Sequence, residues 1–198
     1  MCSQLIKGGL SGAIILFIWG MVSWMVLPWH NMTMSGFKDE AVMEKIILEQ
    51  APSKGVYILP YWNCKANPAM SKEEKKALME QNCAKMMKGP FVFAVINPQG
   101  TGMSMKASMI GSFVIQLIGA LLVTALLSKA NIQNYFCKVI FTTMFGLAAG
   151  VVCFLPGWNW WGFPVNYTLI AILDLVAGWF LAGLVLAAIV KNNQATCN

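Results

Sequence analysis

Asp174 is the side chain of this 198-residue sequence that first suggests chemistry, because it is the only acid in four long apolar stretches. An ionisable group inside a membrane-spanning segment is costly, so it counts as a functional hypothesis. Neutral polar side chains are expected at a similar depth in the other stretches. The sequence therefore predicts an intramembrane polar layer that consists of Asp174, Gln116, Thr142, Thr143 and Ser23.

Two interpretations of this polar layer are open. Asp174 could be a protonation or cation site, with Gln116 and the threonines as supporting ligands. Alternatively, a protonated Asp174 could hydrogen-bond to Gln116 and hold the helices in register, each bond contributing about 1 kcal/mol. The structural interpretation is favoured, because a proton path usually needs several such groups and the sequence offers one.

Cys64 and Cys83 are the only two of six cysteines that share the long segment between the first two apolar stretches. In an oxidising compartment such a pair predicts a structural disulfide. Closing a loop of about 20 residues would stabilise the segment by about 3 kcal/mol in the chain-entropy model. The alternative is two free thiols, with Cys83 filling a core. A redox-active pair is not expected, since the sequence contains no C-x-x-C motif.

Methionines gather where the long segment leaves and re-enters the apolar stretches. Together with the only histidine they form a candidate metal-ligand set: His30, Met32, Met34, Met103 and Met105. Thioethers with an imidazole suit Cu(I), so a periplasmic copper site is one hypothesis. The favoured interpretation is that methionine is a flexible apolar filler and His30 an interfacial polar residue. We therefore expect no cofactor.

Aromatic residues dominate the segment between the third and fourth apolar stretches. The aromatic residues that we single out in this segment are Trp158, Trp160, Trp161 and Phe163. Amphipathic indoles settle at the level of the lipid headgroups, which predicts an anchor in the outer leaflet. A surface that docks a protein partner is the alternative, because large aromatic residues are common in the centres of interfaces.

The composition explains why these residues must be considered in a membrane. Hydrophobic residues make up 58% of the chain and charged residues only 11%, and the mean hydropathy is +0.62. Soluble domains carry about 25% charged residues, so an ordinary soluble enzyme, a disordered chain and a coiled coil are excluded. The net charge of +6 comes from lysine alone, and without arginine no nucleic-acid partner is expected. Membrane lipid is the predicted surrounding.

Four stretches are long enough to cross a bilayer, which takes roughly 20 apolar residues each. They cover residues 8–29, 107–128, 135–156 and 165–190. Lys138, near one end of the third stretch, is expected to reach the headgroups. Glycines four residues apart, Gly8 with Gly12 and Gly146 with Gly150, predict close helix contacts within one chain or between two copies. The predicted fold is a membrane all-α, four-transmembrane-helix bundle.

The lysines of the short connections predict the orientation. Lys7, Lys129, Lys138 and Lys191 fall on one side of the membrane, and the loop 155–167 on the other side carries no charge. By the positive-inside rule the N- and C-termini are cytoplasmic and residues 30–106 extracytoplasmic. The lysine-only basic content is typical of a bacterial inner-membrane protein. The predicted domains are therefore 1–29, 30–106 and 107–198.

Residues 30–106 carry the patterns of a small α/β (α-β-α-β) cap. Apolar residues at helical spacing run from Phe37 to Ala51, and a strand pattern follows over 55–59. Ser71 and Glu74 form a capping box that opens a second helix. The apolar stripe of that helix is Leu78, Met79, Cys83, Met86 and Met87, and a second strand is expected over 91–96. At about 75 residues the cap is small, so we expect it to lean on the bundle or on a partner.

These observations favour a non-catalytic accessory, assembly or interaction role, carried by the cap and the aromatic loop towards a protein partner or a second copy. A small oligomeric proton- or cation-coupled carrier or channel that uses Asp174 is the first alternative, and a Cu(I)-handling protein is the second. An enzyme is not expected, because the sequence shows no nucleophile–base pair, metal cluster or phosphate-binding loop.

Overall fold

The computed structural model describes residues 2–61, 70–102 and 104–191. The chain divides into two compact units. The first comprises Met1–Ser35 and Met103–Asn198 and is called the helical unit below. The second, Gly36–Gly102, is called the inserted unit. Each is described by itself.

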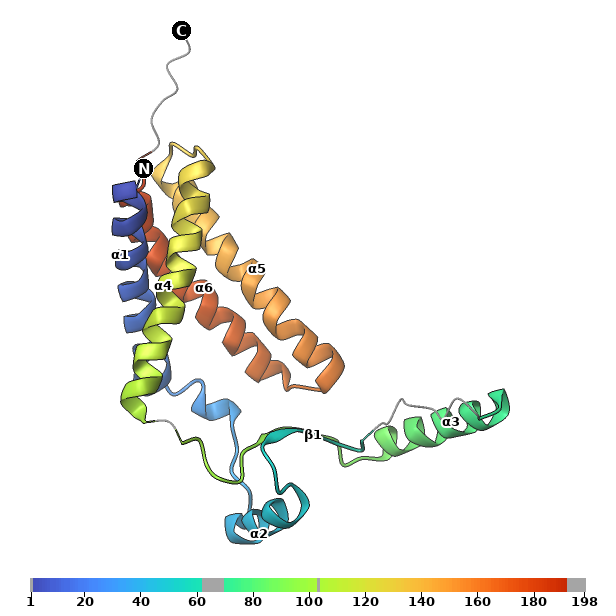
Figure 1. Cartoon of the computed structure of the whole chain (residues 1–198). Helices are drawn as coiled ribbons and strands as arrows, with labels where there is room; N and C mark the ends of the chain where they lie inside the picture. Colours follow the sequence, from blue (N-terminus) through green and yellow to red (C-terminus); the bar gives the residue numbers. More distant parts are fainter. Residues whose placement is uncertain (1, 62–69, 103, 192–198) are drawn as a thin grey trace. The chain divides into compact units, whose positions relative to one another are not determined.

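Four long helices make up the helical unit (Figure 1). They are α1 (Cys2–Met21), which a π-helical turn η1 (Val22–Val26) prolongs, α4 (Met105–Lys129), α5 (Tyr135–Trp161) and α6 (Val165–Ile189). All four are long and apolar enough to cross a membrane. The prediction of four apolar helices is confirmed, and they indicate an integral membrane protein whose helices contact lipid.

Side-chain capping explains where two of these helices begin. The Ser104 hydroxyl accepts a hydrogen bond from the backbone N–H of Ala107, and the Asn134 side chain accepts one from Cys137. Each side chain satisfies an N–H group that the first turn of a helix leaves without a backbone partner. The left-handed Gly162 ends α5, because a residue without Cβ adopts a φ of 67° without strain.

Glycines allow the helices to pack closely. A Cβ on Gly146 of α5 would lie 2.7 Å from the Cβ of Trp179 on α6, and one on Gly150 would lie 3.2 Å from Ile172 Cγ2. Similarly, Gly8 of α1 faces Thr124 of α4. The glycine pairs predicted from the sequence therefore mark contacts within one chain.

The core of the helical unit lies where α1, α4 and α6 meet. Its fully buried side chains include Val123 and Leu127 of α4 and Leu186 of α6. Large apolar side chains such as Phe136, Val152 and Leu173 point away from the core and are more than half exposed. This inverted pattern suits helices that are surrounded by hydrocarbon instead of water.

The third span differs from its prediction in two respects. The helix does not end at Pro156 but continues to Trp161. Proline removes one backbone hydrogen bond, and a membrane helix tolerates this loss where neighbouring groups compensate for it. Lys138 does not reach outwards. It is 6% exposed, and its Nζ donates a hydrogen bond to the carbonyl oxygen of Val190 at 2.5 Å. A cation at the end of α6 satisfies a terminal carbonyl and complements the negative end of the helix dipole.

The inserted unit contains α2 (Glu40–Gln50), β1 (Gly55–Leu59), α3 (Lys72–Lys88) and β2 (Val92–Ile96). The predicted order of elements between the first two spans is confirmed. Ser71 and Glu74 form the predicted capping box of α3. The strands pair antiparallel, with Gly55 opposite Ile96 and Leu59 opposite Val92, and form a two-stranded sheet.

The inserted unit has little core of its own. Among its described residues Ala51 is the only buried apolar side chain, and neither α2 nor α3 buries any residue. The apolar stripe of α3 is only partly covered: Cys83 and Leu78 are half-buried, whereas Met79 is 56% and Met87 90% exposed. Eight of the 17 residues of α3 are lysine or glutamate, and Lys76 and Glu80 form an i,i+4 ion pair, as suits a solvated helix.

Candidate functional site

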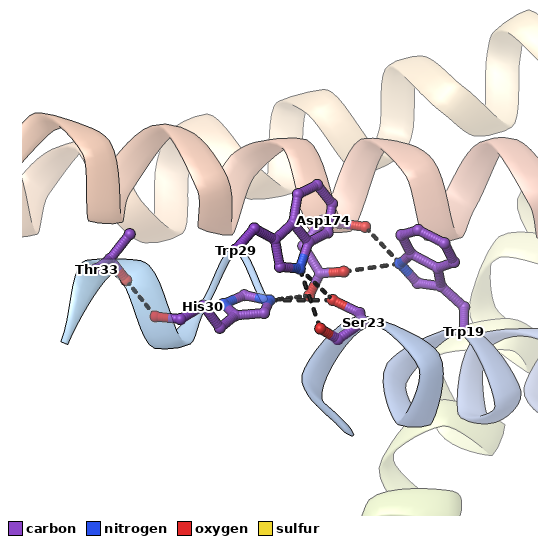
Figure 2. A network of polar contacts seen from close by, with 6 residues as sticks. All are labelled: Trp19, Ser23, Trp29, His30, Thr33 and Asp174. Carbon is purple, nitrogen blue, oxygen red and sulfur yellow. Dashed lines mark hydrogen bonds and ion pairs between the residues drawn. The ribbon is translucent and has the colours of Figure 1, made fainter. Parts of the chain in front are cut away.

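Asp174 of α6 is the centre of a network of polar contacts within the helical unit (Figure 2). The indole Nε1 of Trp19 donates to its Oδ1 at 2.7 Å and to its backbone oxygen at 3.0 Å. From the other side the imidazole Nε2 of His30 lies 3.4 Å from Oδ2. Gly178, one turn after Asp174, makes room for the indole, since a Cβ there would lie 2.9 Å from the ring of Trp19.

The chain after α1 positions His30. A short 3₁₀ turn (Asn31–Thr33) follows it, and the Thr33 hydroxyl donates to the His30 carbonyl at 2.8 Å. The imidazole is stacked on the ring of Trp24, with centroids 3.9 Å apart and planes 7° from parallel. The residue is only 4% exposed. His30 thus returns to the helices after the chain has left α1.

The π-helical turn η1 places Ser23 in the same network. The Ser23 hydroxyl lies 3.0 Å from His30 Nε2. The backbone carbonyl oxygen and the hydroxyl oxygen of Ser23 each accept a hydrogen bond from Trp29 Nε1 at 3.1 Å. In a π-helix the backbone donor for the Ser23 carbonyl would be residue 28, but Pro28 has no N–H. The Trp29 indole replaces that donor. Such π-helical turns are frequent at functional sites.

The electrostatics of the network are those of a desolvated acid–base pair. Ser23 is fully buried, and the side chains of His30 and Asp174 are 5% and 18% exposed. Leaving either partner alone in a low-dielectric site would be expensive, so each side chain compensates for the burial of the other. An imidazole beside a carboxylate is a combination that proton-handling sites use in general.

A cavity of about 390 Å³ adjoins this network. Its walls are formed by the second half of α1, the first half of α4 and the middle of α6. Asp174 and Gln116 both line it, together with Ser108 and Ser112. Most of the remaining wall is apolar or aromatic. The cavity therefore combines an apolar body with a few polar groups, as ligand sites do.

The structure unites only part of the predicted polar layer. Ser23 and Asp174 are joined through His30, and Gln116 shares the cavity wall with Asp174. Thr142 and Thr143 instead donate to the carbonyls of Lys138 and Val139, four residues earlier on α5. The layer as a functional unit stays a prediction.

The aromatic residues that were expected in a loop lie on the last turns of α5. Trp158, Trp160 and Trp161 are 48%, 73% and 39% exposed. Phe163 follows the helix end, close to Gly157, with its ring 5.5 Å from that of Tyr167. Half-exposed indoles at a helix end suit an interfacial anchor. The anchor and the docking role stay predictions.

The predicted metal and disulfide residues are mostly apart or outside the described residues. His30 is bound in the network, Met32 and Met34 are 76% and 49% exposed, and Met105 lines the cavity. Met103 lies outside the described residues. Cys83 is a free thiol, and Cys64 also lies outside the described residues. The copper site and the Cys64–Cys83 disulfide stay predictions.

Three tryptophans of the site were not anticipated: Trp19, Trp24 and Trp29. A usable signal exists in the sequence. Trp19 lies four residues before Ser23, hence on the same face of a helix predicted over 8–29, and Pro28 removes an N–H from that helix, which leaves a carbonyl that needs another donor. In comparisons with known proteins, no family model, no curated protein and no solved structure matches the chain.

Proposed function

We propose that this protein is a non-catalytic accessory protein of a bacterial inner membrane, which binds a partner protein through the inserted unit. The four apolar helices serve as its anchor. Both termini are cytoplasmic and the inserted unit is extracytoplasmic in this proposal. The lysines of the short connections support that orientation, because Lys7, Lys129 and Lys191 fall on the side opposite the inserted unit.

The incomplete sheet of the inserted unit is the observation that carries the proposal. A two-stranded sheet is marginal in water and needs a third strand or a packed helix. Within the described part of the unit, neither helix buries a residue against the sheet. Val56 and Val95 are paired across the strands and are 61% and 74% exposed. A partner that covers this pair would supply the packing that the two-stranded sheet lacks.

Charge and backbone indicate a protein as the partner. Helix α3 carries lysines and glutamates side by side, beginning with Lys72, Glu73 and Glu74, so the unit offers no uniform basic surface to anionic lipids. Within the described part of the chain both strands are edge strands of the two-stranded sheet. An extended segment of a partner can pair with such an edge, as in strand addition.

Val95→Lys is expected to release the partner. In a gentle-detergent purification the wild-type chain should carry a stoichiometric companion, which the variant loses, because a lysine ammonium cannot be buried in an apolar contact. Val42→Lys is the matched control, since Val42 is an exposed valine of α2 in the same unit. A lone wild-type monomer, or equal loss in both variants, would contradict the proposal. A companion identical to the chain would identify the partner as a second copy.

A second candidate function is a proton- or cation-coupled carrier. The pairing of His30 with Asp174 beside a cavity favours it, because histidines and acids inside a membrane are the side chains from which proton relays are built. Asp174→Asn is then expected to abolish flux in proteoliposomes while the chain stays folded, since the amide oxygen can still accept from Trp19. Equal flux in both proteins, or none in either, would contradict this candidate.

A further inference from the structure

We propose that the cavity of the helical unit binds a membrane amphiphile with an ammonium head group. The head group would lie between Asp174 and Gln116, and the apolar chain would lie among the methionine and aromatic side chains of the wall. This inference goes beyond the interaction role proposed above. It concerns the membrane-embedded unit and needs no partner protein.

The cavity arises from the distribution of small and large residues along α1. Near its beginning, Gly8, Gly9 and Gly12 allow close contact with α4, where a Cβ would come within 3.1 Å of a neighbouring side chain. Further along, Trp19 and Met21 of α1 and Trp24 of η1 line the cavity instead. Small residues let two backbones approach, and large ones hold them apart. The sequence of α1 therefore builds a tight contact first and a cavity after it.

One wall of the cavity is a polar stripe on α4. Ser108, Ser112 and Gln116 are spaced four residues apart, hence on one face of the helix, and all three line the cavity. Within the described part of the chain their side chains make no hydrogen bond. Polar groups that face hydrocarbon without a partner cost several kcal/mol each. A ligand whose head group forms hydrogen bonds would supply those partners.

The charge of the wall selects the kind of head group. Among the described residues that line the cavity, Asp174 is the only ionisable one, and none is a lysine or histidine. His30, which contacts Asp174 Oδ2, does not line the cavity, so the ionisable group that a head group meets there is the carboxylate. That carboxylate would repel an anionic head group and attract an ammonium group. The indoles of Trp19, Trp24 and Trp179 also line the cavity and offer aromatic faces to a cation.

Size and access fit a membrane amphiphile. The volume of about 390 Å³ falls in the range of about 300–1,000 Å³ that small-ligand sites occupy. Met25 and Met105, which line the cavity, are 74% and 73% exposed and so place its opening on the surface of the helices. Around spanning helices that surface contacts hydrocarbon. The ammonium group could belong to an aminophospholipid of the bilayer or to a free lipophilic amine.

Photolabelling of the full chain tests the proposal. The chain is placed in phosphatidylcholine nanodiscs with a photoactivatable long-chain primary amine, and with the matched long-chain sulfate. We expect saturable labelling by the amine, mapped to the cavity-lining residues of α1 and α4, and about tenfold weaker labelling by the sulfate. Equal labelling by both probes would overturn the proposal.

Competition identifies the source of the ammonium group. Loss of amine labelling when phosphatidylethanolamine is added supports the bilayer lipid as ligand. Loss only with an unlabelled long-chain amine supports a free lipophilic amine. Labelling that neither compound displaces would overturn the proposal, because a specific site saturates.

Gly20→Phe is the variant that fills the cavity. Gly20 lines the cavity, and a Cβ there meets no atom within 4 Å, so the side chain can enter without a clash. We expect saturable labelling to fall by about tenfold. Gly111→Phe is the matched control, since a Cβ on Gly111 of α4 also meets nothing within 4 Å and the residue does not line the cavity.

Gln116→Leu, which removes a head-group contact, should also weaken labelling. Undiminished labelling in Gly20→Phe and Gln116→Leu would overturn the proposal.

Discussion

Gly146→Leu is expected to lower the free energy of unfolding of the helical unit by about 3 kcal/mol, the upper end of the usual range for overpacking. A Cβ at this position would lie 2.7 Å from the Cβ of Trp179 and 3.0 Å from the carbonyl oxygen of Leu175. The carbonyl belongs to the backbone of α6, which cannot rotate away as a side chain can. The two helices would have to separate, and the close packing along α5 and α6 would be lost.

Unfolding of the purified chain in mixed detergent micelles, followed by tryptophan fluorescence, measures this effect. Gly111→Leu is the matched control, because the same side chain is introduced on a spanning helix where a Cβ meets nothing within 4 Å. It should leave the midpoint unchanged within about 0.5 kcal/mol, as surface substitutions do. Similar destabilisation by both variants would show that leucine in place of glycine acts through the helix itself and not through the contact with α6.

The elements of this fold follow largely from local features of the sequence. Uninterrupted apolar stretches of sufficient length predict the four long helices, because a bilayer leaves the backbone few alternatives. The capping box at Ser71 and Glu74 predicts the start of α3, and the β-branched and aromatic residues of 55–59 predict β1. Each of these signals acts within a few residues, and this is why it can be recognised without the structure.

The ends of the helices depend on compensation that is not local. Pro156 ends a helix only if no other group compensates for the missing N–H, and α5 instead continues for five residues. Lys138 was expected among the headgroups because a buried ammonium is costly, but the carbonyl of Val190, 52 residues away, accepts its hydrogen bond. Partners so distant in sequence become visible only when the helices are placed side by side.

The candidate site, like the fold, could be predicted only in part from the sequence. Asp174 could be identified because a single acid in an apolar span is exceptional. Its pairing with Trp19 and His30 could not, since these side chains reach it through the rotation of α1 about its axis and the return of the chain after Pro28. Thr142 was expected at the same level, yet it faces Gly183 at the contact between α5 and α6. Depth along a helix can be counted in the sequence, whereas the direction in which a side chain points depends on packing.

Asp174→Ala is expected to lower the free energy of unfolding by about 3 kcal/mol, because it removes one partner of a desolvated pair. The substitution leaves the His30 imidazole and the Trp19 indole without the carboxylate that both now contact at 3.4 and 2.7 Å. Asp174→Asn should cost only about 1 kcal/mol, since its amide oxygen can still accept from the indole. The same micelle unfolding experiment measures both variants.

A double-mutant cycle with His30→Ala separates the pair from the general role of Asp174 in the bundle. If the two side chains stabilise each other, the double variant should lose about 1–2 kcal/mol less than the sum of the two single variants. Thr33→Ala is a suitable second position for comparison, because its hydroxyl bonds to the backbone of His30 and not to Asp174. Strict additivity between Asp174→Ala and His30→Ala would contradict the pairing. Coupling confined to that combination would show that the contact ties the segment after α1 to the middle of α6, and that the network acts as a structural clamp.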